Sequence, residues 1–182
     1  MDSPTSSIEL PSPEQALTAL QTAIGQIRFA REYTLGLLDA TPDEHWYAIP
    51  DGLPTNIAWQ VGHLTVSQYG LLLFRIRGRE PEDLKLIPGR FRKAYGRGSE
   101  PSADPSRQPT PDELRERLER VFTLGLDLAE TLTPEILLEP VEMPYAVYPI
   151  KLGAILFCPL HEQIHAGQIG LLRRALGCEP VR

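Results

Sequence analysis

"HEQIHAGQIGLLRRALG", residues 161–177, constrains the fold more than any other part of the chain. Its apolar residues recur at the three- and four-residue spacing of an amphipathic helix, and Gly177 is a typical helix stop. Two histidines, His161 and His165, lie four residues apart within it. Four residues turn a helix by about 40° more than one full turn, so both imidazoles point to the same side. The stretch therefore predicts a helix that can present two ligands to one metal ion.

The apolar pattern extends this helix upstream to residue 150. Pro159 lies inside it, and a proline removes a helical hydrogen bond and crowds the preceding turn. Two alternatives follow. Either the helix kinks at Pro159, or a short helix ends there.

Three further long helices are predicted upstream. Ser12 opens a capping box with the glutamine three residues later, and Thr110 opens one with a glutamate at the same spacing. Between these two helices, Thr55 or Asn56 can cap a third apolar stretch, which ends at Gly78. The predicted helices cover residues 13–39, 55–78 and 110–132.

The connections between these helices are unequal in length. Residues 79–109 are rich in proline and glycine and lack a clean period, which predicts a long ordered loop with room for short helical turns. A second proline-rich connection covers residues 133–149. Four long helices without convincing strands predict an all-α fold, a four-helix bundle with long loops between helices 2 and 3 and helices 3 and 4. Residues 1–11 are expected to be a flexible arm, and residues 12–182 a single domain.

Composition excludes several classes of protein. The formal net charge of −6 argues against a nucleic-acid or membrane-surface binder. No apolar run approaches the roughly 20 residues that span a bilayer, and the N-terminus lacks the apolar core of a signal peptide, so the cytoplasm is the expected location. Cys158 and Cys178 are too far apart along one helix to form a disulfide, which fits a reducing compartment.

A metal site needs more than two ligands. His63, in the middle of the second predicted helix, is the obvious third. Three histidines and an open position are the ligand count of a catalytic zinc site, and imidazole also suits nickel and copper. The alternative is that His63 is a hydrogen-bonded core residue and that the pair is a solvated or core feature. His45, in an acidic segment, is expected at the surface.

The sequence of residues 161–165 also matches the zinc-peptidase motif H-E-x-x-H, in which Glu162 would be the general base. A third ligand downstream of His165 is missing, because the extended motif would need histidine at Leu171. We therefore expect no peptide cleavage. Glu162 flanks the ligands on the helical wheel and stays a candidate for proton transfer in other chemistry.

"TNIAWQVGHL", residues 55–64, a long loop with glycine and proline, and the terminal "HEQIHAGQIGLLRRALG" together resemble the DinB-like family of metal-binding four-helix bundles. The resemblance covers nearly the whole chain from residue 12. It implies that His63, His161 and His165 bind one divalent ion per chain, zinc before nickel, with water in the open position. It also implies a possible homodimer.

Several neighbours of the histidines are candidates for a second shell or a pocket. Gln168, seven residues after His161, shares its side of the helix and can hydrogen-bond an imidazole or bound water. Gly62 and Gly167 flank the histidines, and a close backbone approach is a reason for glycine in a helix. Cys158 is expected to be a buried structural thiol.

Residues 75–97 carry eight basic and three acidic residues. Such a run is usually a solvated loop. The alternative is that part of it covers the metal pocket and attracts an anionic substrate, with Arg92 and Tyr95 as pocket candidates and Phe91 beside them.

The leading functional hypothesis is a metal-dependent enzyme for a small molecule. The resemblance implies thiol-dependent transferases, and transfer to a low-molecular-weight thiol is slightly favoured over hydrolysis. The alternative is a non-enzymatic, dimeric metal-binding or stress-response module. A substrate-sized cavity beside the histidines would separate the two hypotheses.

Overall fold

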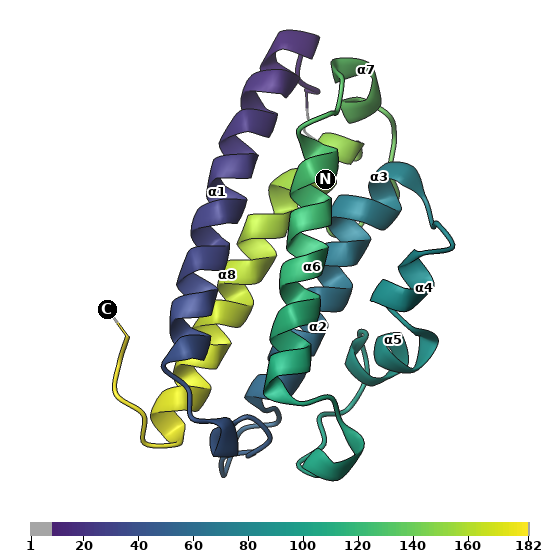
Figure 1. Ribbon diagram of the computed structural model, residues 1–182. Helices are drawn as coiled ribbons and strands as arrows, with labels where there is room; N and C mark the ends of the chain where they lie inside the picture. The colour runs from purple at the N-terminus through teal and green to yellow at the C-terminus, as the bar shows by residue number, and fades with distance from the viewer. Residues whose placement is uncertain (1–8, 182) are drawn as a thin grey trace, which may run out of the picture.

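The computed structural model describes residues 9–181, and the bundle it forms is all-helical, as predicted (Figure 1). Most of the expected N-terminal arm, residues 1–8, lies outside the described residues. Within residues 9–181 the only β-type contact is an isolated bridge between Pro140 and Ile150. The four long helices are α1 (Pro13–Asp39), α2 (Ile57–Tyr69), α6 (Pro111–Ala129) and α8 (Lys151–Ala175).

The predicted helix starts are confirmed. The Ser12 hydroxyl accepts from the backbone N–H of Gln15, whose side chain accepts from the Ser12 N–H in return. Thr110 opens the same reciprocal cap at α6. At α2 the capping residue is Asn56, whose side-chain oxygen accepts from the Trp59 N–H at 2.9 Å. Each cap satisfies backbone donors that a helix start leaves free.

The second helix contains a feature that its sequence does not reveal. After α2 the chain continues through η2, a π-helical turn (Gly70–Phe74), into α3 (Arg75–Arg77). It then ends at Gly78, as predicted, with a φ of 82° that suits glycine. Such π-turns are rare in proteins overall, and those that occur often lie near functional sites. Here the turn supplies Gly70 and Leu71 to the wall of a cavity described below.

Pro159 does not end the fourth helix. The helix α8 is continuous from Lys151 to Ala175, so the alternative of a short helix that ends at Pro159 is wrong. Pro159 is buried within this helix, although it lacks the N–H that would complete the helical hydrogen bonding at its position. The continuity matters because it fixes the orientation of the histidines that follow.

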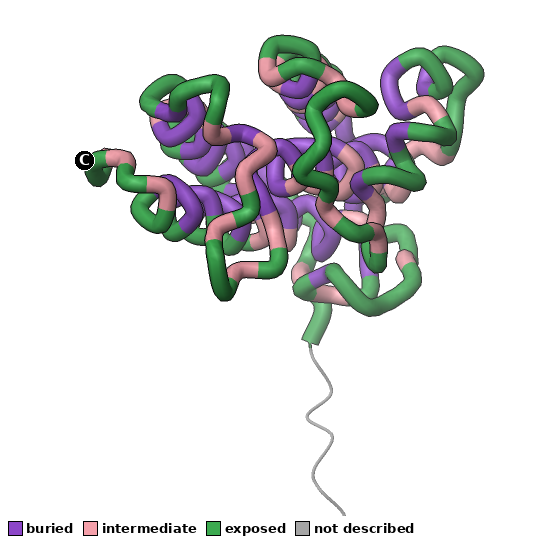
Figure 2. Tube along the Cα trace, turned by 90° about the horizontal axis from the view of Figure 1, so that it is seen from below, coloured by how far each residue is buried: buried purple, intermediate pink, exposed green. Residues whose placement is uncertain are grey.

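The long helices pack in a defined order (Figure 1). Helix α1 lies along α8, α2 lies along α6, and α2 also contacts α8. Figure 2 shows buried residues gathered between the helices and exposed residues on the outside and in the loops. Two apolar clusters fill the interior: one surrounds Trp46, Ile57 and Leu118, and the other surrounds Leu20, Ile27 and Leu152. No helix within residues 9–181 has the length and hydropathy of a bilayer span.

The long connection after α3 is ordered and contains short helices, as expected. It carries α4 (Asp83–Leu86), α5 (Gly89–Tyr95) and the 3-10 turn η3 (Pro105–Arg107). Two further short elements are η1 (Asp43–His45) and α7 (Pro134–Leu137). Of these, α5 matters most for the site, because it packs against α2.

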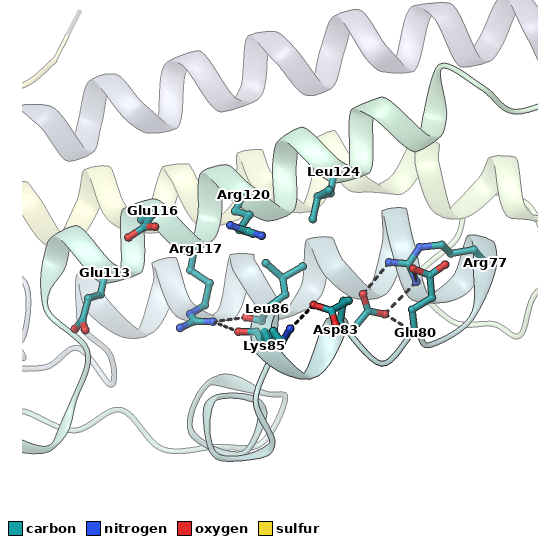
Figure 3. Close-up of a pocket in the computed structure, with 11 residues that line it drawn as sticks. Arg77, Glu80, Asp83, Lys85, Leu86, Glu113, Glu116, Arg117, Arg120 and Leu124 are labelled. Atoms are coloured by element: carbon teal, nitrogen blue, oxygen red, sulfur yellow. Dashed lines mark hydrogen bonds and ion pairs between the residues drawn. The ribbon is translucent and has the colours of Figure 1, made fainter.

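A buried carboxylate fixes the start of α4. Asp83, whose side chain is 5% exposed, accepts from both terminal nitrogens of Arg77, at 2.8 and 3.0 Å (Figure 3). It also accepts from the Tyr69 hydroxyl and the Glu80 N–H. The hydrogen bonds from Arg77 lower the pKa of Asp83 to about 2. The groove beside α6 in Figure 3 carries both signs of charge, and Arg117 crosses it to the carbonyls of Lys85 and Leu86.

Replacing Asp83 with asparagine should therefore change stability in a pH-dependent way. The carboxyl pKa is lower in the folded than in the unfolded chain, so its contribution is present above about pH 4 and is lost as pH falls towards 2. We expect Asp83→Asn to lower the free energy of unfolding by about 2 kcal/mol at pH 7. Urea denaturation at pH 7 and pH 2.5 measures this, and the difference should shrink at the lower pH.

The matched control is Asp39→Asn, since the Asp39 carboxylate pairs with Arg115 but is 72% exposed. Exposed ion pairs contribute little, so this variant should stay close to the parent at both pH values. Equal losses in the two variants, or a loss in Asp83→Asn that persists at pH 2.5, would contradict the assignment.

Candidate metal centre

Three histidines from two helices meet inside the bundle. His63 comes from α2, and His161 and His165 come from α8. One ring nitrogen from each lies within 4.8 Å of those from the other two. The ring centroids of His63 and His165 are 4.9 Å apart, and those of His161 and His165 are 4.5 Å apart. The packing of α2 on α8 thus joins residues about 100 positions apart into one cluster that could hold a metal ion.

Burial keeps these imidazoles neutral at pH 7. Loss of solvent lowers the pKa of His63, lowers that of His161 to about 4 and lowers that of His165 to about 3. The neighbouring histidines lower the last two further. A metal ligand must be unprotonated, so the cluster is ready to bind without first losing a proton.

Hydrogen bonds orient two of the three rings. The Nδ1 of His63 donates to the backbone carbonyl of Tyr95 at 2.9 Å, and the Nδ1 of His165 donates to the side-chain carbonyl of Gln60. Because a carbonyl oxygen only accepts, both protons are on Nδ1 and both Nε2 atoms carry a lone pair. The Ser67 hydroxyl lies 3.2 Å from the Nε2 of His63 and donates to that lone pair, a hydrogen bond that an ion bound to Nε2 would replace. This donor set fits a divalent ion such as zinc.

The orientation of Gln60 is itself fixed. Gln60 is buried, and its side-chain N–H donates to the Thr55 hydroxyl at 3.0 Å, which turns the carbonyl towards His165. We expect Gln60→Leu to weaken zinc binding roughly 10- to 100-fold, because a leucine cannot hold the imidazole in this tautomer. Zinc titration in competition with a chromophoric chelator measures the affinity. Gln168→Leu is the control, and an equal effect in both variants would show that Gln60 has no special role.

Close packing of α5 on α2 explains one of the two glycines beside the histidines. A Cβ atom at Gly62 would lie 2.2 Å from the ring of Tyr95, so only glycine allows α5 to approach. The same approach brings the Tyr95 carbonyl to His63. On the other side, Trp59 stacks on His63 with centroids 4.8 Å apart. Gly167 has open space around its Cα, so the expectation of a close approach there is wrong.

Several predicted neighbours lie elsewhere. Gln168 is exposed on α8 and, within residues 9–181, makes no hydrogen bond to a histidine, so Gln60 takes the place expected for it. Arg92 is exposed on α5 and does not line the cavity. Phe91 is buried in the core and not at a pocket mouth. His45 lies outside the cluster, with its Nδ1 3.3 Å from the sulfur of Cys178.

The cysteines are free thiols, as expected. Cys158 is buried in α8, and burial raises its pKa to about 12. A thiol with this pKa is protonated at pH 7 and is a poor ligand or nucleophile. Cys158 therefore acts as a core residue.

Glu162, the candidate proton-transfer residue, lies in the core. It is 2% exposed, and its carboxylate accepts from the Nε of Arg31 at 2.8 Å and from the side-chain N–H of Gln68 at 3.3 Å. Both carboxylate oxygens are thus held by buried donors. The geometry assigns Glu162 to an internal ion pair, which removes the feature that made H-E-x-x-H resemble a peptidase motif.

A cavity of about 350 Å³ opens beside the cluster. His63 and His161 form part of its wall, and most of the rest is apolar. Two cations from the basic run, Arg75 and Arg97, also line it, whereas none of the described residues that line it is acidic. Part of the basic run therefore does lie beside the histidines. The remaining wall residues are Val66, Ser67, Gly70, Leu71, Tyr145 and Phe157.

Of the three site residues that the sequence did not single out, Gln60, Arg97 and Tyr145, only Gln60 left a trace there. Gln60 is a polar residue in an otherwise apolar stretch, one turn before His63, and that contrast marks it as a hydrogen-bonding partner. Arg97 was one of eight basic residues in its run, with nothing to distinguish it. Tyr145 lies in the last loop, where no period indicates its position.

Fold and site together define a class: a helical bundle with a cluster of neutral histidines, contributed by two of its helices, at the wall of a cavity. The chain belongs to the DinB superfamily, whose family model matches residues 26–169. The matched region includes all three histidines. A search of curated proteins found no match to the chain.

Proposed function

We propose that His63, His161 and His165 hold one divalent metal ion, zinc before nickel, and that the protein is a metal-dependent enzyme for a small molecule. Three neutral imidazoles beside a cavity of substrate size carry this proposal. A scaffold that only stores or senses a metal needs no such cavity next to its ligands. When bound, the ion supplies a Lewis acid that acidifies a thiol or a water in its open position.

Thiol transfer is the reaction we favour over hydrolysis. Hydrolytic sites commonly use a carboxylate or a free histidine as general base, but no acidic residue lines the described cavity and Glu162 is held by Arg31. A thiol needs less help, because its proton is lost readily near neutral pH. In the transfer the thiol proton passes to solvent, the sulfur bonds to the electrophilic carbon, and the leaving group departs with its electron pair.

The residues of the chain have separate tasks in this proposal. Tyr95 and Gln60 hold the ligand rings, and Trp59 supports the face of His63. The apolar walls exclude water from the electrophile. Ser67, next to the Nε2 of His63, is placed to hydrogen-bond a ligand that enters the cavity.

The test is a direct assay of zinc-loaded protein with small thiols, such as cysteine and glutathione, and a fluorogenic alkyl halide. The proposal expects formation of the thioether to depend on metal, and to be lost in His161→Ala. Ester or amide hydrolysis without thiol would favour a hydrolase instead. Stoichiometric zinc binding without turnover of any thiol would favour the non-enzymatic module.

A further inference from the structure

The cavity beside the histidines has an unbalanced charge. Its wall contains the guanidinium groups of Arg75 and Arg97, and none of the described residues that line it is acidic. The chain as a whole carries a formal charge of −6, so this concentration of positive charge is local. Such a wall attracts an anion and disfavours a cation.

The two arginines have different tasks. Arg75 donates from one terminal nitrogen to the carbonyl of Tyr145, at 3.1 Å, and from the other to that of Pro144, at 2.9 Å. Tyr145 has a φ of 73°, a conformation that costs a non-glycine residue about 1 kcal/mol or more and needs support from its surroundings. Arg75 supplies that support. Its two terminal nitrogens are therefore engaged in holding the backbone of Tyr145, which lines the cavity.

Arg97 is different because its donors are available. Its guanidinium lies 5.5 Å from the centroid of the Tyr145 ring, on the wall of the cavity. Within residues 9–181, the contact with the Tyr145 ring is the one interaction found for this side chain, and no hydrogen bond or ion pair involves it. The contact with the ring orients the Arg97 guanidinium without using any of its N–H groups. A guanidinium with free N–H groups can donate two parallel hydrogen bonds to a carboxylate.

The rest of the cavity suits an apolar body. Val66, Leu71, Tyr145 and Phe157 line it with aliphatic and aromatic side chains. Its volume of about 350 Å³ is at the lower end of the roughly 300–1,000 Å³ seen for small-molecule sites. A compact aromatic or aliphatic group fits this space, with one end at the histidines and the other at Arg97.

We propose that the substrate is a small carboxylate with an apolar body, and that Arg97 is the residue that selects its anionic group. The proposal deepens the proposed function and rests on it, since it assigns the substrate class of the same cavity. Arg75 is a positioning residue that holds the wall against which the body lies.

The test compares two probes of the same shape, 3-phenylpropionate and its neutral amide, by NMR titration of metal-free, isotope-labelled protein at pH 7. We expect the carboxylate to bind roughly three- to tenfold more tightly than the amide, a modest factor because Arg97 is exposed. Arg97→Gln should remove this preference while the amide binds as before. Arg75→Gln should weaken both probes alike, because the wall is lost.

Arg92→Gln is the matched control, since Arg92 belongs to the same basic run but does not line the cavity. It should keep the full preference for the carboxylate. Equal binding of the two probes by the parent, a preference that survives in Arg97→Gln, or no binding of either probe at millimolar concentration would overturn the proposal. The titration uses neither metal nor turnover, so a failure of the proposed catalytic function would leave its result unchanged.

Discussion

Replacing Arg31 with methionine is expected to lower the free energy of unfolding by about 3–5 kcal/mol, because it leaves the buried carboxylate of Glu162 without its cation. Arg31 is 2% exposed and contacts each of the other three long helices: Glu162 on α8, Gln68 on α2, and the Leu118 carbonyl with Glu119 on α6. One buried guanidinium therefore links α1 to all three of the other long helices, in addition to the apolar packing of α1. Urea denaturation at pH 7 measures the loss.

The same helix offers a matched control. Arg28 pairs with Glu130 at 2.7 Å, but both side chains are more than half exposed, so Arg28→Met should change stability by less than about 1 kcal/mol. Replacing Glu162 with leucine in the Arg31→Met background removes the unpaired charge and should recover part of the loss. If Arg31→Met is as stable as Arg28→Met, Arg31 does not hold the bundle together.

His63→Ala is expected to weaken zinc binding roughly a hundred- to thousandfold. A four-ligand zinc site contributes about 10–16 kcal/mol, so the share of one ligand is several kcal/mol. The parent should retain about one zinc ion per chain after dialysis, and the variant close to none. The effect is informative because His63 lies 98 positions before His161 and joins it only through the packing of α2 on α8.

His45→Ala is the control for this measurement, since His45 is a histidine outside the cluster. Elemental analysis and zinc titration should give parent values for it. A His63→Ala protein that keeps one tightly bound zinc ion would mean that the metal is held elsewhere. Circular dichroism of both variants separates loss of a ligand from loss of the fold.

The parts of the fold that depend on neighbouring residues were predictable. Ser12 and Thr110 cap their helices through residues three positions further along the chain. The four-residue spacing of His161 and His165 likewise determines that their side chains point to the same side of the helix. The π-turn at Gly70–Phe74 was not predictable, because nothing in its sequence indicates the change of hydrogen-bond register. Leu72, inside this turn, packs so close to Gly125 on α6 that a Cβ atom at Gly125 would lie 2.8 Å from its side chain, a contact between residues far apart in the sequence.

The site was only partly predictable, for a geometric reason. Gln168 shares the direction of His161 on the helical wheel, but seven residues advance a helix by about 10 Å, which carries it past the cluster. Gln60 reaches His165 from another helix, at a sequence separation of 105. Likewise, Glu162 meets Arg31 across 131 residues, and a wheel drawn for one helix contains no information about that partner.

The zinc K-edge X-ray absorption spectrum of zinc-loaded protein shows which atoms bind the metal. We expect about three imidazole ligands with zinc–nitrogen distances of about 2.0–2.1 Å, one further light ligand and no sulfur. The spectrum of His63→Ala should show one imidazole fewer, or the variant should bind no zinc. A spectrum with sulfur at about 2.3 Å, or with a single imidazole, would contradict a site of three histidines.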